Sequence, residues 1–257
     1  MAREVPWRWA AAGLACGLLL ALVLFAPARW LAGWIQGATA GQVQLQDVRG
    51  TVWSGSGRVV LTGGVGSSAA AALPGRLAWT LAPRWNGVAA DLRADCCMTT
   101  PVPLRARLRW GGVDLDIGDS VSQWPAALAS GLGTPWNTLQ LDGELQVTTR
   151  DLSVEWVAGR PAVRGRAELV AMRVASRLST LRPMGSYRIT LQGGTPTTLR
   201  LETLDGSLQL SGSGQWVGSR LRFRGEASAA PEREAALANL LNIIGRRSGA
   251  RSIISIG

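Results

Sequence analysis

Residues 104–110 read Leu-Arg-Ala-Arg-Leu-Arg-Trp, with an arginine at every second position. In an extended strand, successive side chains point to opposite faces, so the arginines share one face and the apolar residues share the other. Residues 220–224, Arg-Leu-Arg-Phe-Arg, repeat this alternation. Strands with one wet face and one dry face are typical of an antiparallel sheet that covers an apolar interior.

Further strands are expected on the N-terminal side of this stretch. Residues 42–46 alternate glutamine with valine and leucine, and residues 77–81 form a second short apolar run. Between them, residues 50–57 contain glycines that bend or bulge a strand, with Trp53 as a large buried group. Turn signals recur about every 10 residues, which indicates a meander or an open, curved sheet. The expected fold is therefore mainly β, a curved antiparallel sheet, with a short helix at 123–130 and a turn at 135–137.

Weak internal repetition is visible in the predicted β region. Residues 141–146, Leu-Asp-Gly-Glu-Leu-Gln, resemble residues 204–209, Leu-Asp-Gly-Ser-Leu-Gln. The Ser-Gly-Ser-Gly of residues 54–57 recurs at residues 211–214, each time near a tryptophan. Two related β-halves would explain these similarities, although glycine-rich turns also recur by chance.

The C-terminal region has a helical pattern. Pro231 favours a helix start and Gly245 a helix end, so a helix is expected over residues 231–244. This helix either packs on the protein's own sheet or docks a partner, and residues 252–256 are expected to pair as a last strand. Its apolar face and the basic residues after it are the candidate partner-binding residues: Leu237, Leu240, Leu241, Ile244, Arg246 and Arg247.

A membrane anchor is expected near the N-terminus. Residues 10–28 carry no charged side chain, and a helix of this length just spans a hydrocarbon core of about 30 Å. Residues 26–28, Ala-Pro-Ala, also resemble a signal-peptidase site, so a cleaved export signal is the alternative. Tryptophans flank the uncharged run and are expected at the membrane interface: Trp7, Trp9, Trp30 and Trp34.

The anchor divides the chain into four parts. Residues 1–9 form a net positive tail that should stay in the cytoplasm, and residues 10–28 form the transmembrane helix. Residues 29–41 follow as a periplasmic linker, and residues 42–257 form a periplasmic β-rich domain. The expected location is the inner membrane, crossed once, with the bulk of the chain in the periplasm.

Composition excludes most catalytic chemistry. The net charge is +10, all 27 basic residues are arginine, and the chain contains no histidine. Ser-His-Asp triads, histidine metal sites, Walker A loops and lysine Schiff bases are therefore impossible, so no enzymatic activity, cofactor or metal is expected. The anchor and the lack of a nucleic-acid-binding motif argue against nucleic acid. The positive charge instead indicates a solvated sheet face, an acidic partner or lipid headgroups.

Cys96 and Cys97 are adjacent in the sequence. In an oxidising periplasm they can form a vicinal disulfide. Free thiols and intermolecular bridges are the alternatives, and the sequence does not choose among the three.

Several motifs resemble one protein family. Residues 50–55, Gly-Thr-Val-Trp-Ser-Gly, behind an N-terminal anchor, resemble the N protein of the type II secretion system, the GspN family. Residues 134–139, 181–187 and 212–216 carry the same resemblance, and so do residues 240–247 with 252–257, which are the most specific. The motif residues expected to have structural roles are Gly50, Thr51, Val52, Trp53, Gly55, Trp136, Tyr187 and Trp216.

The resemblance implies a non-enzymatic accessory component of the machine that exports folded proteins across the outer membrane. It implies contacts with the inner-membrane platform (the L, M and C proteins) and with the outer-membrane secretin. A more distant similarity to AsmA-type proteins implies the alternative, a lipid-binding groove lined by the dry faces of the strands. A sheet filled by its own side chains would favour the first function, and an open apolar channel the second.

Overall fold

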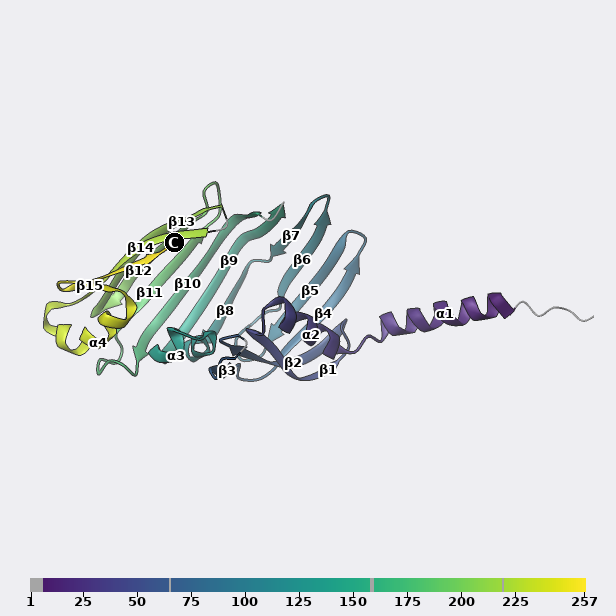
Figure 1. Cartoon of the computed structure of the whole chain (residues 1–257), viewed down its shortest axis with the longest axis horizontal. Coiled ribbons are helices and arrows are strands. Elements are labelled where there is room, and N and C mark those ends of the chain that lie inside the picture. Colours follow the sequence, from purple (N-terminus) through teal and green to yellow (C-terminus); the bar gives the residue numbers. More distant parts are fainter. Residues whose placement is uncertain (1–6, 65, 158–159, 219) are drawn as a thin grey trace, which may run out of the picture.

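One large antiparallel sheet forms most of the protein. The computed structural model describes residues 7–64, 66–157, 160–218 and 220–257. Sixteen strands join in a single sheet of order β1-β2-β4-β5-β6-β7-β9-β10-β11-β12-β13-β14-β16-β15, in which β3 also pairs with β2 and β8 with β9 (Figure 1). The prediction of a mainly β, antiparallel fold is therefore confirmed.

The strands follow one another along the chain, mostly as hairpins. Their bounds are β1 (Val43–Gly50), β2 (Ser54–Thr62), β3 (Ala70–Ala72), β4 (Leu77–Arg84), β5 (Gly87–Ala94), β6 (Val102–Arg109), β7 (Gly112–Ile117), β8 (Ser120–Pro125), β9 (Leu141–Val157), β10 (Arg160–Ser176), β11 (Gly185–Gln192), β12 (Thr198–Gly206), β13 (Leu208–Val217), β14 (Arg220–Ala229), β15 (Arg246–Ser248) and β16 (Arg251–Ile256).

One helix lies away from the sheet, and others lie along the edge formed by one end of the strands. Helix α1 projects away from the sheet, and α3 and α4 lie beside the lower ends of the strands (Figure 1). The helical segments are α1 (Trp7–Leu24), α2 (Ala28–Ala38), the 3₁₀ helix η1 (Ala126–Leu132), α3 (Trp136–Leu139), the 3₁₀ turn η2 (Pro231–Arg233) and α4 (Glu234–Ile244).

The alternation read from the sequence separates the two faces of the sheet. On β6, Arg105 and Arg107 are exposed while Leu104 and Ala106 are half-buried. On β14 the three arginines are exposed and Phe223 between them is buried. Leu108 departs from the pattern, because it lies near the end of β6 and is 68% exposed.

Helix α4 closes the main core of the protein. Leu237, Leu240 and Leu241 are buried and form a cluster with Tyr187 of β11 and Leu208 of β13. The burial favours the packing interpretation of this leucine stripe, because apolar side chains in the protein's own core are not exposed to a partner, and the docking role of these residues stays a prediction. Ile244 is half-buried beside the same cluster. The helix and the final strand β16 lie where the sequence predicted them.

Tyr187 lies in the same core and gives it a spectroscopic reporter. Its hydroxyl donates to the carbonyl oxygen of Leu208 at 3.1 Å, and burial raises the pKa of the Tyr187 phenol far above its ordinary value. The raised pKa means that the folded state disfavours the phenolate. This contribution to stability is complete below pH of about 10, where the unfolded chain is also protonated, and is lost as the pH rises further.

We expect tyrosinate absorbance to appear only as the protein unfolds in alkali. The chain contains one tyrosine, so ultraviolet difference absorbance reports Tyr187 alone and can be compared with circular dichroism along the same titration. Tyr187→Phe removes the signal and serves as its control. Ionisation near pH 10 with the β spectrum intact would contradict the buried position of Tyr187.

A second, smaller core contains one cysteine of the adjacent pair, Cys97. Leu73, Ala94 and Cys97 are buried together, and Trp124 and Leu128 pack against them. The structure joins Cys96 and Cys97 in a vicinal disulfide with an S–S distance of 2.15 Å. It forms part of the connection between β5 and β6, where Cys96 is exposed.

The N-terminal segment differs from the expectation of one helix over residues 10–28. Helix α1 ends at Leu24 and α2 starts at Ala28, because Pro27 adopts an extended conformation between them. The predicted linker at 29–41 is mostly the helix α2, which the sequence analysis missed. Within the described ranges, none of the helices is both long enough and apolar enough to cross a membrane.

Two short predicted elements also need correction. Residues 123–130 were expected as one helix, but β8 continues to Pro125 and η1 follows it. Gln123 pairs with Gln146 of β9, and this ladder keeps it extended. At residues 135–137, Pro135 is in a turn as predicted, but Trp136 and Asn137 start the short helix α3.

The repeated Leu-Asp-Gly segments share a local conformation. Gly143 has φ +128° and Gly206 has φ +123°. A Cβ at Gly143 would meet the carbonyl oxygen of Met172, and one at Gly206 would meet that of Met184. Both positions therefore require glycine, because a neighbouring strand approaches closely at a positive φ. The origin of the repeat by duplication stays a prediction.

Candidate interaction surface

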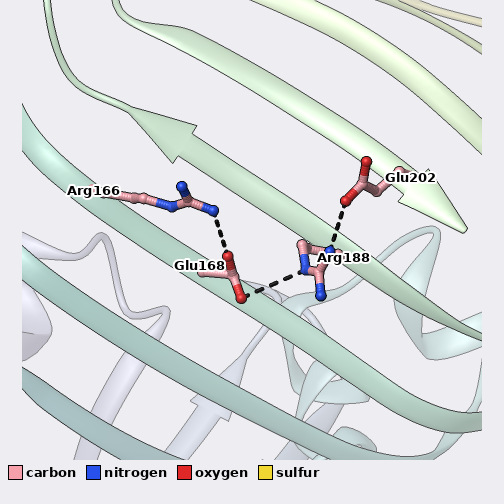
Figure 2. A network of polar contacts seen from close by, with 4 residues as sticks. All are labelled: Arg166, Glu168, Arg188 and Glu202. Atoms are coloured by element: carbon pink, nitrogen blue, oxygen red, sulfur yellow. Dashed lines mark hydrogen bonds and ion pairs between the residues drawn. The ribbon is translucent and has the colours of Figure 1, made fainter. Parts of the chain in front are cut away.

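The polar face of the sheet carries an ordered network of charges. Arg166 lies 2.6 Å from Glu168 on β10, Arg188 of β11 lies 3.5 Å from Glu168, and Arg188 lies 2.9 Å from Glu202 of β12. Figure 2 shows Arg188 between the two glutamates, so the network runs across three neighbouring strands. The cross-strand register explains this, because Arg188 and Glu202 are directly opposite.

Elsewhere on the sheet, arginines are also paired with carboxylates. Arg107 and Arg109 of β6 lie 3.3 Å from Asp116 and 2.6 Å from Asp114 of β7. Arg251 of β16 lies 3.1 Å from Glu226 of β14. Asp114 is buried, whereas the pairs Arg107–Asp116 and Arg251–Glu226 are partly exposed. Partly exposed pairs contribute little stability each, so their main effect is to cancel charge locally.

Beside the network, the same region is hollowed along β13. Two adjoining hollows of about 760 and 560 Å³ share Arg200, Ser213 and Arg224. Their floor is built from the small residues of the segment 211–214, Ser-Gly-Ser-Gly, and Arg200 of β12 and Arg222 and Arg224 of β14 flank it. We call this feature the β13 trough. Ser213 is the central residue, because it is directly opposite Arg200 on one side and Arg224 on the other.

The β13 trough has an excess of positive charge. Its two glutamates are each paired with an arginine, Glu202 with Arg188 and Glu226 with Arg251. Arg200, Arg222 and Arg224 are exposed, and in the described part of the chain none of these three is in an ion pair within 4.0 Å. A concave surface of one sign concentrates ligands of the opposite sign.

These hollows give no support to an apolar lipid groove. Their lining is mixed: besides the arginines, Thr198, Ser213, Gln215 and Ser255 line the larger one, and an exposed apolar side chain, Ile253, lines the smaller one. On the dry face, the end of the sheet near α4 is filled by that helix and the leucines of the main core.

The sequence-predicted site residues are not brought together. Trp7, Trp9, Trp30 and Trp34 are exposed on α1 and α2. Arg246 and Arg247 are exposed on β15, the last strand in the sheet order, and do not line the β13 trough.

The motif at residues 50–55 connects the N-terminal helical segment to the sheet through hydrogen bonds. The indole N–H of Trp53 donates to the carbonyl oxygen of Val23 at 2.7 Å, and the Val52 N–H donates to that of Ala26 at 2.8 Å. Trp53 is half-buried instead of buried, and Trp79 is the buried tryptophan of this region. Gly55 is required because a Cβ there would lie 2.6 Å from the Trp79 ring.

The other motif residues also have structural positions. Thr51 forms a turn with Ser54, and Gly50 adopts φ +88° beside it. Trp136 is 42% exposed on α3. The backbone N–H of Trp216 on β13 donates to the Thr197 carbonyl oxygen at 2.9 Å.

Arg200 is the trough residue that sequence analysis missed. Residues 199–202, Leu-Arg-Leu-Glu, carry the same alternation as residues 220–224. That alternation predicts an exposed arginine, but it does not show which strand lies beside it or whether a carboxylate is in reach.

Comparison with known proteins gives one match. The family model described as type II secretion system (T2SS), protein N matches residues 41–254. The matched segment contains the whole sheet except the last residues of β16. No curated protein matches, and no solved structure matches.

Proposed function

The chain belongs to the type II secretion system protein N family, and from this premise we propose that it acts by contacting other secretion proteins. Membership of this family implies that the protein is an accessory component of type II secretion located in the cell envelope. More specifically, the proposed role of the sheet is to provide a contact surface for the platform proteins L, M and C or for the secretin. It is supported by the β13 trough, where three arginines have no carboxylate partner in the described chain.

The proposed location is the inner membrane, with the sheet in the periplasm. The support comes from the uncharged residues 10–28 and from the exposed tryptophans on both sides of them. The disulfide between Cys96 and Cys97 agrees with an oxidising compartment.

The proposed role includes no catalysis. With no histidine and no lysine in the chain, a histidine general base and a lysine Schiff-base nucleophile are missing. The ionisable groups of the network in Figure 2 are instead paired with one another.

Deletion of the gene is expected to make a substrate of the secretion system accumulate in the periplasm at the expense of the medium. Restoring the full chain should restore export, and restoring Leu240→Asp, which disrupts the core, should not. Cross-linking in intact cells should recover L, M, C or the secretin with the protein in the inner-membrane fraction. Unchanged export in the deletion strain, with none of these proteins cross-linked, would overturn the proposed function.

A further inference from the structure

The spacing of the trough arginines matches an extended polypeptide. Arg222 and Arg224 are two residues apart on β14, which places them about 7 Å apart along the strand. Arg200 and Arg224 face each other across Ser213, so their strands are about 9.5 Å apart, or two ladder spacings. An extended chain above β13 would therefore lie between arginines on both sides.

The chemical groups that match these arginines best are carboxylates. A guanidinium presents a planar fork of donors that matches a carboxylate, and charge-assisted bonds of this kind are stronger than neutral ones. In an extended chain, side chains at alternate positions share one face with the same repeat of about 7 Å. Acidic residues at every second position would thus reach Arg222 and Arg224 in turn.

The floor of the trough favours a polypeptide over a lipid. Ser211, Ser213 and Gln215 project from β13 on this face and offer hydroxyl and amide groups. From Ser211 to Gln215 the strand rises by about 13 Å, enough for about four extended residues. A peptide backbone could hydrogen-bond with these hydroxyl and amide groups, and Ile253, which lines the smaller hollow, adds an exposed apolar side chain beside them.

We propose that the β13 trough binds an extended acidic segment of a partner protein, with carboxylates at alternate positions paired to Arg222 and Arg224 and a further one to Arg200. The proposal rests on the proposed function, since it names the chemistry of the partner that the sheet contacts. It predicts binding that weakens with salt, because the contacts are charge pairs at a partly exposed surface.

The experiment measures binding of a fluorescent synthetic peptide in which glutamate alternates with serine. Titration with the purified full-length protein, followed by fluorescence anisotropy at low salt, should show saturable binding. Arg222→Glu with Arg224→Glu should weaken it on the order of 100-fold, since each lost charged contact is worth about a tenfold change in affinity. The same peptide with glutamine for glutamate should not bind.

A matched control separates the trough from net charge. Arg177→Glu with Arg182→Glu makes the same change in charge at exposed positions in the segment between β10 and β11, and should leave the affinity within about twofold of the parent. Equal weakening by both pairs would overturn the proposal, as would failure of the parent to bind the peptide. Trough-dependent capture of phosphatidylglycerol vesicles without peptide binding would also overturn it.

Folding and secretion are scored separately. All charge variants should keep the parent's circular dichroism spectrum, because the substituted arginines are exposed. Arg222→Gln with Arg224→Gln repeats the binding test without charge reversal and should also abolish tight binding of the peptide. Peptide affinity is measured in purified protein. Unchanged export in the deletion strain, with none of the secretion proteins cross-linked, therefore overturns the proposed function, whereas loss of peptide selectivity in the purified protein overturns the proposal for the trough.

Discussion

Leu240→Asp is expected to abolish cooperative folding of the sheet around α4. Leu240 is 2% exposed, with Leu237 and Leu241 at 0% beside it. Truncation of such a leucine to alanine costs about 2–5 kcal/mol, and an ionised carboxylate in the same space costs more. The total stability of a domain is about 5–15 kcal/mol, so this one change removes most of it.

Thermal unfolding followed by circular dichroism checks this result. Leu240→Asp should show no cooperative transition, whereas Leu240→Ala should show one at a lower temperature. Asn242→Asp is the matched control, because Asn242 is exposed on the same helix and the new charge stays in water. A melting temperature of Leu240→Asp equal to that of Asn242→Asp would contradict the buried position of the helix.

Gly206→Ala is expected to give the second large loss of stability, about 3–6 kcal/mol. Gly206 has φ +123°, and an added Cβ would overlap the Cα of Gly185 and the carbonyl oxygen of Met184. These are backbone atoms of the neighbouring β11 and of the segment before it, so no side chain can move aside. The strands β11 and β12 would have to separate at the edge of the main core.

The control for this substitution is Gly111→Ala. Gly111 also has a positive φ, +79°, but nothing lies within 4 Å of an added Cβ. It should therefore cost only the conformational strain, about 1–2 kcal/mol. Gly206→Ala should lower the melting temperature on the order of 10 °C more than Gly111→Ala. Equal shifts would show that strand approach at Gly206 is not tight.

The two faces of the sheet have different roles: one packs the main core and the other exposes charged side chains. On the dry face, Leu237, Leu240 and Leu241 of α4 fill the main core. On the polar face, Arg188 joins Glu168 and Glu202 into a paired network. The neighbouring trough keeps its arginines unpaired in the described chain, which is the property expected of a surface that binds an acidic partner.

The sequence by itself determined the class of fold and several of its elements. The alternation at 104–110 and 220–224 depends only on the two-residue period of a strand, so it was readable without knowing any neighbour. The helix at 231–244 and the last strand were likewise predicted from local signals such as Pro231 and the i, i+3, i+4 spacing of its leucines. Family membership followed from short motifs and is confirmed by the match over 41–254.

Only the tertiary structure decided which residues meet. The break at Pro27 is fixed by hydrogen bonds from Trp53 and Val52 to the N-terminal segment. The burial of the α4 leucines depends on the sheet beneath them, which the helix sequence does not describe. Arg200, Ser213 and Arg224 form one row because β12, β13 and β14 pair in a particular register. Register arises from contacts between residues distant along the chain, and a shift of one residue would turn each of these side chains to the other face.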